Sequence, residues 1–386
     1  MTEDADLAPI REAVRALCAN FPGEYWRRLD RERAYAEEFV AALTRAGFLA
    51  ALIPEEYGGS GLSMSAAAAI MEEIQASGCN GAGCHAQMYT MGTVLRHGSA
   101  EQKKRYLPAI ARGELRLQAF AVTEPGSGTD TLSLRTTATR NGDYYIINGQ
   151  KIWTSRAEHS DLMLLLARTT PRDQVKTRTG GLSVFLLDMR EAGRQGGLTI
   201  RPIRTMMNHA TTEIFFENVR VPADGLIGAE GEGFRYILSG MNAERILIGA
   251  ECVGDARWFI DKAAAYARER VVFGRPIGQN QGVQFPIARA YMGMRAAALM
   301  VREAAALYEA GKDCGAEANM AKQLAAEASW TAADMCLQTH GGFGFAEEFD
   351  IERKFRETRL YSVAPISTNL VLSYVAEHVL GLPRSY

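Results

Sequence analysis

Residues 121–130, AVTEPGSGTD, carry small polar side chains on a turn that follows an apolar run. Pro125, Gly126 and Gly128 interrupt the extended backbone after Val122, because proline lacks an N–H donor and glycine adopts angles that other residues avoid. Such a turn presents backbone N–H groups and threonine hydroxyls, which can bind a polar ligand. Glycine-rich turns are more often plain hairpin corners, so other segments must distinguish the two interpretations.

Four further segments set glycine, glutamine or serine beside an aromatic residue or an arginine. They are QKIWTS at 150–155, RVVFGRPIGQNQ at 270–281, QTHGGFGF at 338–345 and RKFRETRLYSVAPISTN at 353–369. No G-x-G-x-x-G follows a strand and opens a helix, which leaves a nicotinamide or Rossmann-bound flavin site without its usual support. The sequence also lacks H-E-x-x-H, G-x-S-x-G and P-loop motifs, which excludes the commonest hydrolases and kinases.

The composition favours a multidomain enzyme that acts on small molecules. With 386 residues, 47% of them apolar, the chain can bury a large core in two or three domains. The 43 basic and 45 acidic residues nearly cancel, so no nucleic-acid partner is expected. The six cysteines show neither C-x-x-C pairs nor zinc spacing, which predicts reduced, mostly buried thiols and no metal site. The acidic start and the lack of long apolar runs favour a cytoplasmic protein without membrane insertion.

Residues 1–115 show helical patterns. Ser99 and Gln102 have the spacing of a capping box, in which each side chain satisfies a backbone N–H of the other residue. Gly47 and Gly113 follow periodic apolar stretches and predict helix ends. We therefore expect an N-terminal helical domain.

Residues 116–224 change to short runs that are typical of β-strands. Asn141-Gly142 lies between two of these runs and is a strong hairpin signal. The polar segment 171–181 predicts an exposed loop between strands. This part is expected to be a central antiparallel β-barrel or sandwich.

Residues 225–386 return to long helices. Small and apolar residues recur at spacings of three and four from Ile246 to Ala267, and residues 285–310, 316–339 and 366–380 repeat this pattern. Four such helices indicate an antiparallel bundle. The predicted fold is therefore α+β and multidomain, with an N-terminal helical domain, a central antiparallel β-domain and a C-terminal four-helix bundle.

In this order, the segments resemble the acyl-CoA dehydrogenase family over nearly the whole chain. Residues 121–130 resemble the flavin strand and turn of that family, and 150–155 its flavin-packing tryptophan segment. Residues 270–281 resemble its contact with the FAD of a partner subunit, and 338–345 the segment that helps to bind the FAD diphosphate. Each motif alone is weak, whereas five in order are specific.

The resemblance implies which residues would contact FAD. One set would surround the isoalloxazine ring, namely Phe120, Val122, Thr123 and Thr129, with Trp153 and Ser155 on its other flank. Gly128, in the same turn as Thr129, would also bind the cofactor. A second set would bind the diphosphate, the adenine end or other polar groups: Arg270, Phe273, Gln281, Gln338, Gly341, Gly342, Ser367 and Asn369. Judged without the other motifs, Trp153 would be a core residue of the barrel and Arg270 a surface charge.

The family's reaction removes a proton beside a thioester while hydride leaves the next carbon for the flavin, so it requires a carboxylate base. Many members carry this base in a Y-E-G-T segment, and here Pro365 occupies the position of its glutamate. In the isovaleryl-CoA and long-chain branch the base lies in a helical segment similar to SGLDLER, which matches SGMNAER at 239–245. The resemblance therefore implies that Glu244 is the base. By itself, Glu244 beside Arg245 would be a surface acid near a helix start.

Pro365 also affects the expected thioester site. In the family, a backbone N–H at this position helps to bind the thioester oxygen, and proline has none. Loss of one such donor costs about 100- to 1,000-fold in rate, so we expect a pocket altered for a branched or polar acyl group. The resemblance places Asn242, Arg245 and Thr129 near the substrate.

These observations predict an FAD-dependent acyl-CoA dehydrogenase that forms a homotetramer and passes electrons to an electron-transfer flavoprotein. Two alternatives remain open at the level of sequence. One is a flavin oxidase or monooxygenase on the same fold, in which oxygen accepts the electrons. The other is a flavin-binding or acyl-CoA-binding homologue that has lost its chemistry.

Overall fold

The computed structural model describes residues 7–384 and divides into two compact units. Unit 1 combines the residues up to 32 with residues 63–81 and those from 242 onward, and unit 2 comprises residues 33–62 and 82–241. The predicted division into 1–115, 116–224 and 225–386 stays a prediction.

Three helices of unit 2 that precede its sheet in the sequence follow from local signals. They are α4 (Glu37–Arg45), α6 (Ala82–His97) and α7 (Ala100–Ala111), with short 3-10 turns at Phe48–Ala50 and Glu55–Tyr57. The Gln102 N–H donates to the Ser99 hydroxyl at 3.1 Å, and the Ser99 N–H donates to Gln102 Oε1 at 2.9 Å. This confirms the capping box. Gly47 and Gly113 follow α4 and α7 with φ of 78° and 74°, which confirms both predicted helix ends.

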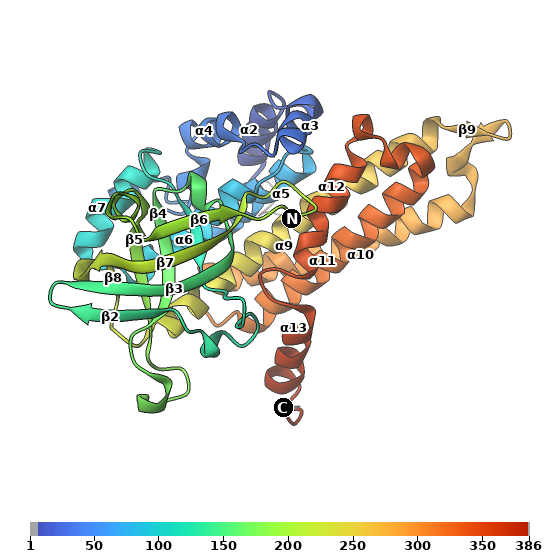
Figure 1. Ribbon diagram of the computed structural model, residues 1–386. Coiled ribbons are helices and arrows are strands. Elements are labelled where there is room, and N and C mark those ends of the chain that lie inside the picture. The colour runs from blue at the N-terminus through green and yellow to red at the C-terminus, as the bar shows by residue number, and fades with distance from the viewer. Residues whose placement is uncertain (1–6, 385–386) are drawn as a thin grey trace. The chain divides into compact units, whose positions relative to one another are not determined.

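Unit 2 also contains an eight-stranded sheet (Figure 1). Its strands are β1 (Leu117–Ala121), β2 (Thr137–Asn141), β3 (Tyr144–Ser155), β4 (Leu162–Arg168), β5 (Leu182–Asp188), β6 (Leu198–Pro202), β7 (Thr211–Pro222) and β8 (Leu226–Ile227). The order is β6-β7-β3-β2-β4-β5-β8, with β1 paired to β4. Strands β2 and β3 form the predicted hairpin at Asn141-Gly142. Most pairs are antiparallel, but β1 and β2 both run parallel to β4.

Strand β4 is buried on both faces. Leu162, Leu164 and Leu166 pack in one apolar cluster with residues of α6 and α7, whereas Met163 and Leu165 pack in a second cluster with β3, β5 and β7. Successive side chains of a strand point to opposite faces, so one continuous apolar run serves both cores. Helix α8 (Met189–Gln195) and strand β6 were not predicted from the sequence.

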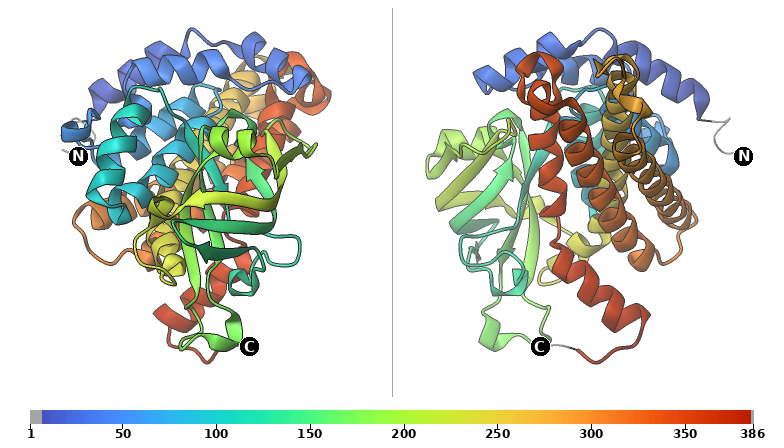
Figure 2. Two further views of the ribbon diagram at one scale, coloured as in Figure 1. Left: turned by 60° about the vertical axis from the view of Figure 1, so that its left-hand side comes forward. Right: turned by 90° about the vertical axis from the view of Figure 1, so that its right-hand side faces the viewer.

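Unit 1 is mainly helical and contains α2 (Ala8–Cys18), α3 (Gly23–Glu32), α5 (Met64–Ala76), α10 (Gln281–Glu309), α11 (Gly315–His340), α12 (Ile351–Thr358) and α13 (Thr368–Tyr374). Helix α9 (Gly233–Glu269) begins in unit 2 and continues in unit 1. Figure 2 shows α9, α10 and α11 side by side. Small residues permit this packing: a Cβ at Gly249 would lie 2.9 Å from Val301 and 3.6 Å from Ala321. The predicted class, with helical ends and a central sheet, is confirmed.

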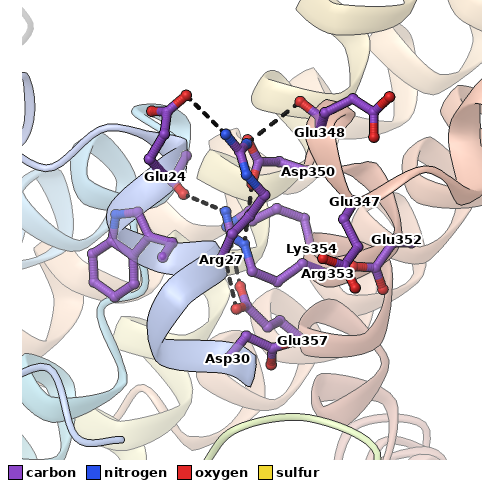
Figure 3. A network of polar contacts seen from close by, with 12 residues as sticks. Glu24, Arg27, Asp30, Glu347, Glu348, Asp350, Glu352, Arg353, Lys354 and Glu357 are labelled. Atoms are coloured by element: carbon purple, nitrogen blue, oxygen red, sulfur yellow. Dashed lines mark hydrogen bonds and ion pairs between the residues drawn. The ribbon is translucent and has the colours of Figure 1, made fainter. Parts of the chain in front are cut away.

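Ion pairs connect α3 to the segment around α12 (Figure 3). Arg27 Nη1 donates to Asp350 Oδ2 at 2.7 Å, and Arg356 Nη2 donates to Asp30 Oδ2 at 2.7 Å. Arg353 is almost completely buried and donates to Glu357 at 2.9 Å. The first two of these pairs thus join residues that are 323 and 326 positions apart in the sequence. All six cysteines are free and buried, as predicted. Among residues 7–384, no helix is both long and apolar enough to span a membrane.

Close packing of α9 on α5 predicts an unequal response to two glycine substitutions. A Cβ at Gly254 would lie 2.2 Å from the Glu72 carbonyl oxygen, whereas a Cβ at Gly193 in α8 would meet nothing within 4 Å. We expect Gly254→Ala to destabilise the protein by about 1–3 kcal/mol, because the two helices must separate. Gly193→Ala should stabilise it by about 0.5–1 kcal/mol. Urea unfolding followed by circular dichroism measures both, and equal effects would contradict the packing described.

Candidate functional site

The turn after β1 is held by its own hydrogen bonds. Glu124 and Ser127 exchange backbone hydrogen bonds of 3.1 and 3.0 Å, and the Ser127 hydroxyl donates to the Asp130 carbonyl at 2.6 Å. Gly126 and Gly128 do not have positive φ, and a Cβ at either would meet nothing within 4 Å. The glycines therefore supply no unusual angles, contrary to the prediction, and instead leave the backbone of the turn uncovered.

Trp153 is turned out of the sheet by a bulge. The register of β3 against β7 shifts between Ile152 and Thr154, and Trp153 between them has φ of 62°. Such an angle is rare for a bulky residue, and a bulge re-aims the side chain that it carries. The Trp153 side chain is 56% exposed, so it is not the core residue that its type alone suggests. It offers an open, flat apolar surface.

The backbone brings the turn and the tryptophan segment together. The Ile152 N–H donates to the Thr123 carbonyl at 2.9 Å. Phe120 and Val122 are half-buried on the apolar cluster with α6, where the Phe120 ring meets Tyr89 edge-on at 5.7 Å. Thr123 and Ser155 are half-buried, and Thr129 is exposed. The six residues predicted to contact the ring, and Gly128, thus belong to two connected segments of unit 2.

A buried ion pair supports these segments, and the sequence analysis did not single it out. Lys151 is 0% exposed, and its Nζ donates to Glu124 Oε1 and to the Val122 carbonyl, both at 2.9 Å. Glu124 also accepts the Arg135 N–H at 2.6 Å and the Thr136 N–H at 2.9 Å. A lone lysine within an apolar strand was the available signal, because buried charges require partners.

Burial changes how both members of the pair titrate. It lowers the pKa of Lys151 to about 8, although Glu124 favours the protonated amine. For Glu124, burial acts to raise the pKa, but Lys151 and the two N–H donors outweigh it and leave this pKa below its usual value. The pair therefore stays charged at neutral pH.

In unit 1, Glu244 is a buried residue of α9. It is 6% exposed and lies well inside the helix, so the alternative interpretation of Glu244 as a surface acid near a helix start is wrong. The neighbouring Arg245 is also buried and donates to Asn242 Oδ1 at 2.9 Å. Burial lowers the pKa of Arg245, and the charge of Glu244 opposes this change. The three candidates on α9 therefore form one polar group.

The loop that contains Pro365 is fixed from α11. Lys322 is completely buried and donates from Nζ to the Ile366 carbonyl at 2.9 Å. The Ser367 hydroxyl accepts the Leu370 N–H at 3.4 Å and so caps α13, a structural use that the sequence analysis did not predict. Asn369 is exposed in the first turn of α13.

The remaining predicted residues of unit 1 are all exposed. Arg270 directly follows α9, and its guanidinium lies 5.8 Å from the centre of the Phe343 ring, which connects the segments 270–273 and 338–345. Phe273 is 99% exposed between β9 (Val271–Val272) and β10 (Arg275–Pro276). Gly341 and Gly342 have open space where a Cβ would stand. Gln281 and Gln338 are exposed in α10 and α11.

The pKa of Lys151 predicts an alkaline rise in stability. In the unfolded chain lysine titrates near 10.5, so between pH 8 and 10.5 the unfolded state binds more protons than the folded state. Stability then increases with pH through this window, by roughly 3 kcal/mol for this group. Denaturant unfolding at several pH values measures the rise. Lys151→Met should remove this rise in stability, whereas the control Lys176→Met, in the exposed loop 171–181, should keep it. The same dependence of stability on pH in the wild type and both variants would contradict the assignment of the rise to Lys151.

Comparison with known proteins gives consistent matches along the chain. Family models of the N-terminal, middle and C-terminal domains of acyl-CoA dehydrogenases match residues 4–114, 119–219 and 231–380. The acyl-CoA dehydrogenase FadE12 of Mycobacterium tuberculosis is 36% identical over 387 residues, covering 100% of this chain and 98% of the relative.

Solved structures agree with these matches. A glutaryl-coenzyme A dehydrogenase in complex with glutaryl-CoA is 29% identical with a TM-score of 0.90, covering 98% of this chain and 96% of the other. The prolyl acyl carrier protein oxidase AnaB is 26% identical with a TM-score of 0.90, covering 98% and 99%. The fold is thus shared by a dehydrogenase and an oxidase.

Proposed function

The chain belongs to the acyl-CoA dehydrogenase family, and we propose that it introduces an α,β double bond into an acyl-CoA thioester with Glu244 as the base. Members of this family are oxidoreductases that act on CH–CH bonds, and FAD is their cofactor. The observation that carries the proposed base is the burial of the Glu244 carboxylate on α9, combined with proline at the position of the more common base.

The residues present fit FAD. The exposed Trp153 offers a flat apolar surface to a ring system. The uncovered backbone at Gly126 and Gly128 permits close approach of a ligand. Arg270 is exposed and can pair with a diphosphate, beside the open glycines at 341 and 342. When bound, FAD would supply the acceptor for the hydride that leaves the carbon next to the deprotonated one.

The chain's own part in the reaction is proton removal. A carboxylate that burial keeps from bulk water can act as a general base toward a carbon acid. Arg245 follows Glu244 directly, and its bond to Asn242 restrains the guanidinium beside the base. Pro365 supplies neither a carboxylate nor an N–H. We therefore propose a thioester site that differs from that of Y-E-G-T relatives and accepts a branched or polar acyl group.

Replacement of Glu244 tests the base directly. Glu244→Gln keeps the size of the side chain but cannot accept the proton, so the rate of flavin reduction by the best acyl-CoA should fall at least 100-fold. FAD content should stay unchanged. Glu269→Gln, an exposed position at the end of the same helix, is the control and should keep the rate. Stopped-flow absorbance under anaerobic conditions gives both rates, and undiminished reduction in Glu244→Gln would reject the base.

Titration of the purified protein with a panel of acyl-CoA thioesters identifies the substrate and distinguishes the candidate electron acceptors. Bleaching of the flavin absorbance without oxygen supports the proposed dehydrogenation. The likeness to the oxidase AnaB supports a second candidate, in which oxygen takes the electrons. Oxygen consumption at the rate of flavin reduction would favour that candidate, and the absence of bleaching by any thioester would favour a catalytically inert homologue. We propose an electron-transfer flavoprotein as the electron acceptor.

Exposed apolar residues support a homotetramer. The hairpin β9–β10 carries Phe273 at 99% exposure, and α10 carries Met292 at 69% and Leu299 at 60%. Met292 and Leu299 are seven residues apart and so lie on one face of α10, and exposed apolar surface of this kind is typical of protein–protein contacts. In the proposal, Arg270 and Phe273 contact the FAD of a partner subunit.

A charge at the hairpin should disrupt this assembly. Phe273→Asp places a carboxylate where an apolar contact is proposed, so we expect smaller species by light scattering and at least a tenfold loss of FAD affinity. Asn141→Asp introduces the same charge in the exposed β2–β3 hairpin and should change neither. An unchanged mass and FAD content in Phe273→Asp would count against the proposed contact.

A further inference from the structure

In the peptide group between Val122 and Thr123, the carbonyl forms a hydrogen bond and the N–H does not, within the described part of the chain. Its carbonyl oxygen accepts a hydrogen bond of 2.9 Å from the ammonium group of Lys151. The N–H of the same peptide belongs to Thr123 and donates to no group within the described part of the chain. Thr123 is half-buried at the start of the uncovered turn. A donor is thus available for a ligand at this position.

A cation on a carbonyl oxygen strengthens the N–H of that peptide as a donor. Hydrogen bonds polarise one another when the groups share a peptide and lie in a medium of low dielectric constant. Lys151 is 0% exposed, so water does not screen its charge. The Thr123 N–H is therefore a stronger donor than an ordinary backbone N–H.

Glu124 keeps both the charge and the geometry in place. Its carboxylate pairs with Lys151 at 2.9 Å and also accepts the N–H groups of Arg135 and Thr136, which lead into β2. Both ends of the turn 123–135 are thus tied to one carboxylate. The adjacent bond from Ile152 to the Thr123 carbonyl fixes the other side of Thr123.

We propose that Lys151 and Glu124 are positioning residues that aim and polarise the Thr123 N–H toward the electronegative edge of the flavin ring. This inference rests on the proposed FAD site. A strengthened donor stabilises the reduced ring, which carries more negative charge, relative to the oxidised ring. The pair thereby raises the reduction potential of the bound flavin without touching it.

The test compares the affinities of the apoprotein for oxidised and reduced FAD. Lys151→Met keeps the length of the side chain and removes the cation, so the preference for reduced over oxidised FAD should fall about tenfold or more. Glu124→Gln should lower this preference in the same direction, because burial lowers the pKa of the amine and Glu124 raises it, so without this carboxylate the amine loses its proton and its charge. Lys176→Met, in the exposed loop, is the matched control and should equal the wild type.

A merely structural pair would give a different result. Both FAD affinities would then fall by the same factor, and the potential of the remaining bound flavin would equal that of the wild type, which would overturn the proposal. If Lys151→Met does not fold, the ratio measured for Glu124→Gln decides. Wild-type protein that binds FAD but is not reduced by any thioester would reject the proposed function and leave this test intact, because chemical photoreduction supplies the reduced flavin.

Discussion

Both units bury charged side chains, and each buried charge has to be met by an opposite charge or by hydrogen-bonding groups. In unit 2, Lys151 lies between the Glu124 carboxylate and the Val122 carbonyl. In unit 1, Lys354 is completely buried, pairs with Asp255 and donates to Gln75 Oε1 at 2.7 Å. Lys151 joins β3 to the turn after β1, and Lys354 joins α12 to α5 and α9, so the packing of these elements depends on the two cations.

Such pairs are not an efficient source of stability. Removal of one partner typically costs about 3–5 kcal/mol, yet an apolar pair of similar volume is often as stable or more so. What a buried pair adds is direction, because a hydrogen bond fixes where a particular backbone group points. Lys151 fixes the Val122 peptide, and Lys322 fixes the Ile366 carbonyl in the loop with Pro365. The family resemblance assigns Val122 to flavin binding, and Ile366 directly follows Pro365, whose position it assigns to thioester binding.

Features that depend on neighbouring residues could be predicted from the sequence. The capping box at Ser99, the helix ends at Gly47 and Gly113 and the Asn141-Gly142 hairpin are such features, because their hydrogen bonds span only a few residues. The parallel pairing of β1 and β2 with β4 was not predictable in this way. Alternation of apolar residues shows that a strand exists, but the direction of its partner is decided by contacts between distant segments.

The sequence by itself determined the family, the cofactor and the residues that are candidates for chemistry, because the motifs occur in order along nearly the whole chain. Only the tertiary structure decided how those residues are presented. A bulge exposes Trp153, which its residue type alone would bury, and packing on α9 buries Glu244, which its charge alone would expose. Exposure depends on what other segments cover. The pairing of Lys151 with Glu124 likewise required β3 and the turn after β1 to meet, since a sequence gives the order of residues along the chain and only folding brings distant ones within hydrogen-bond distance.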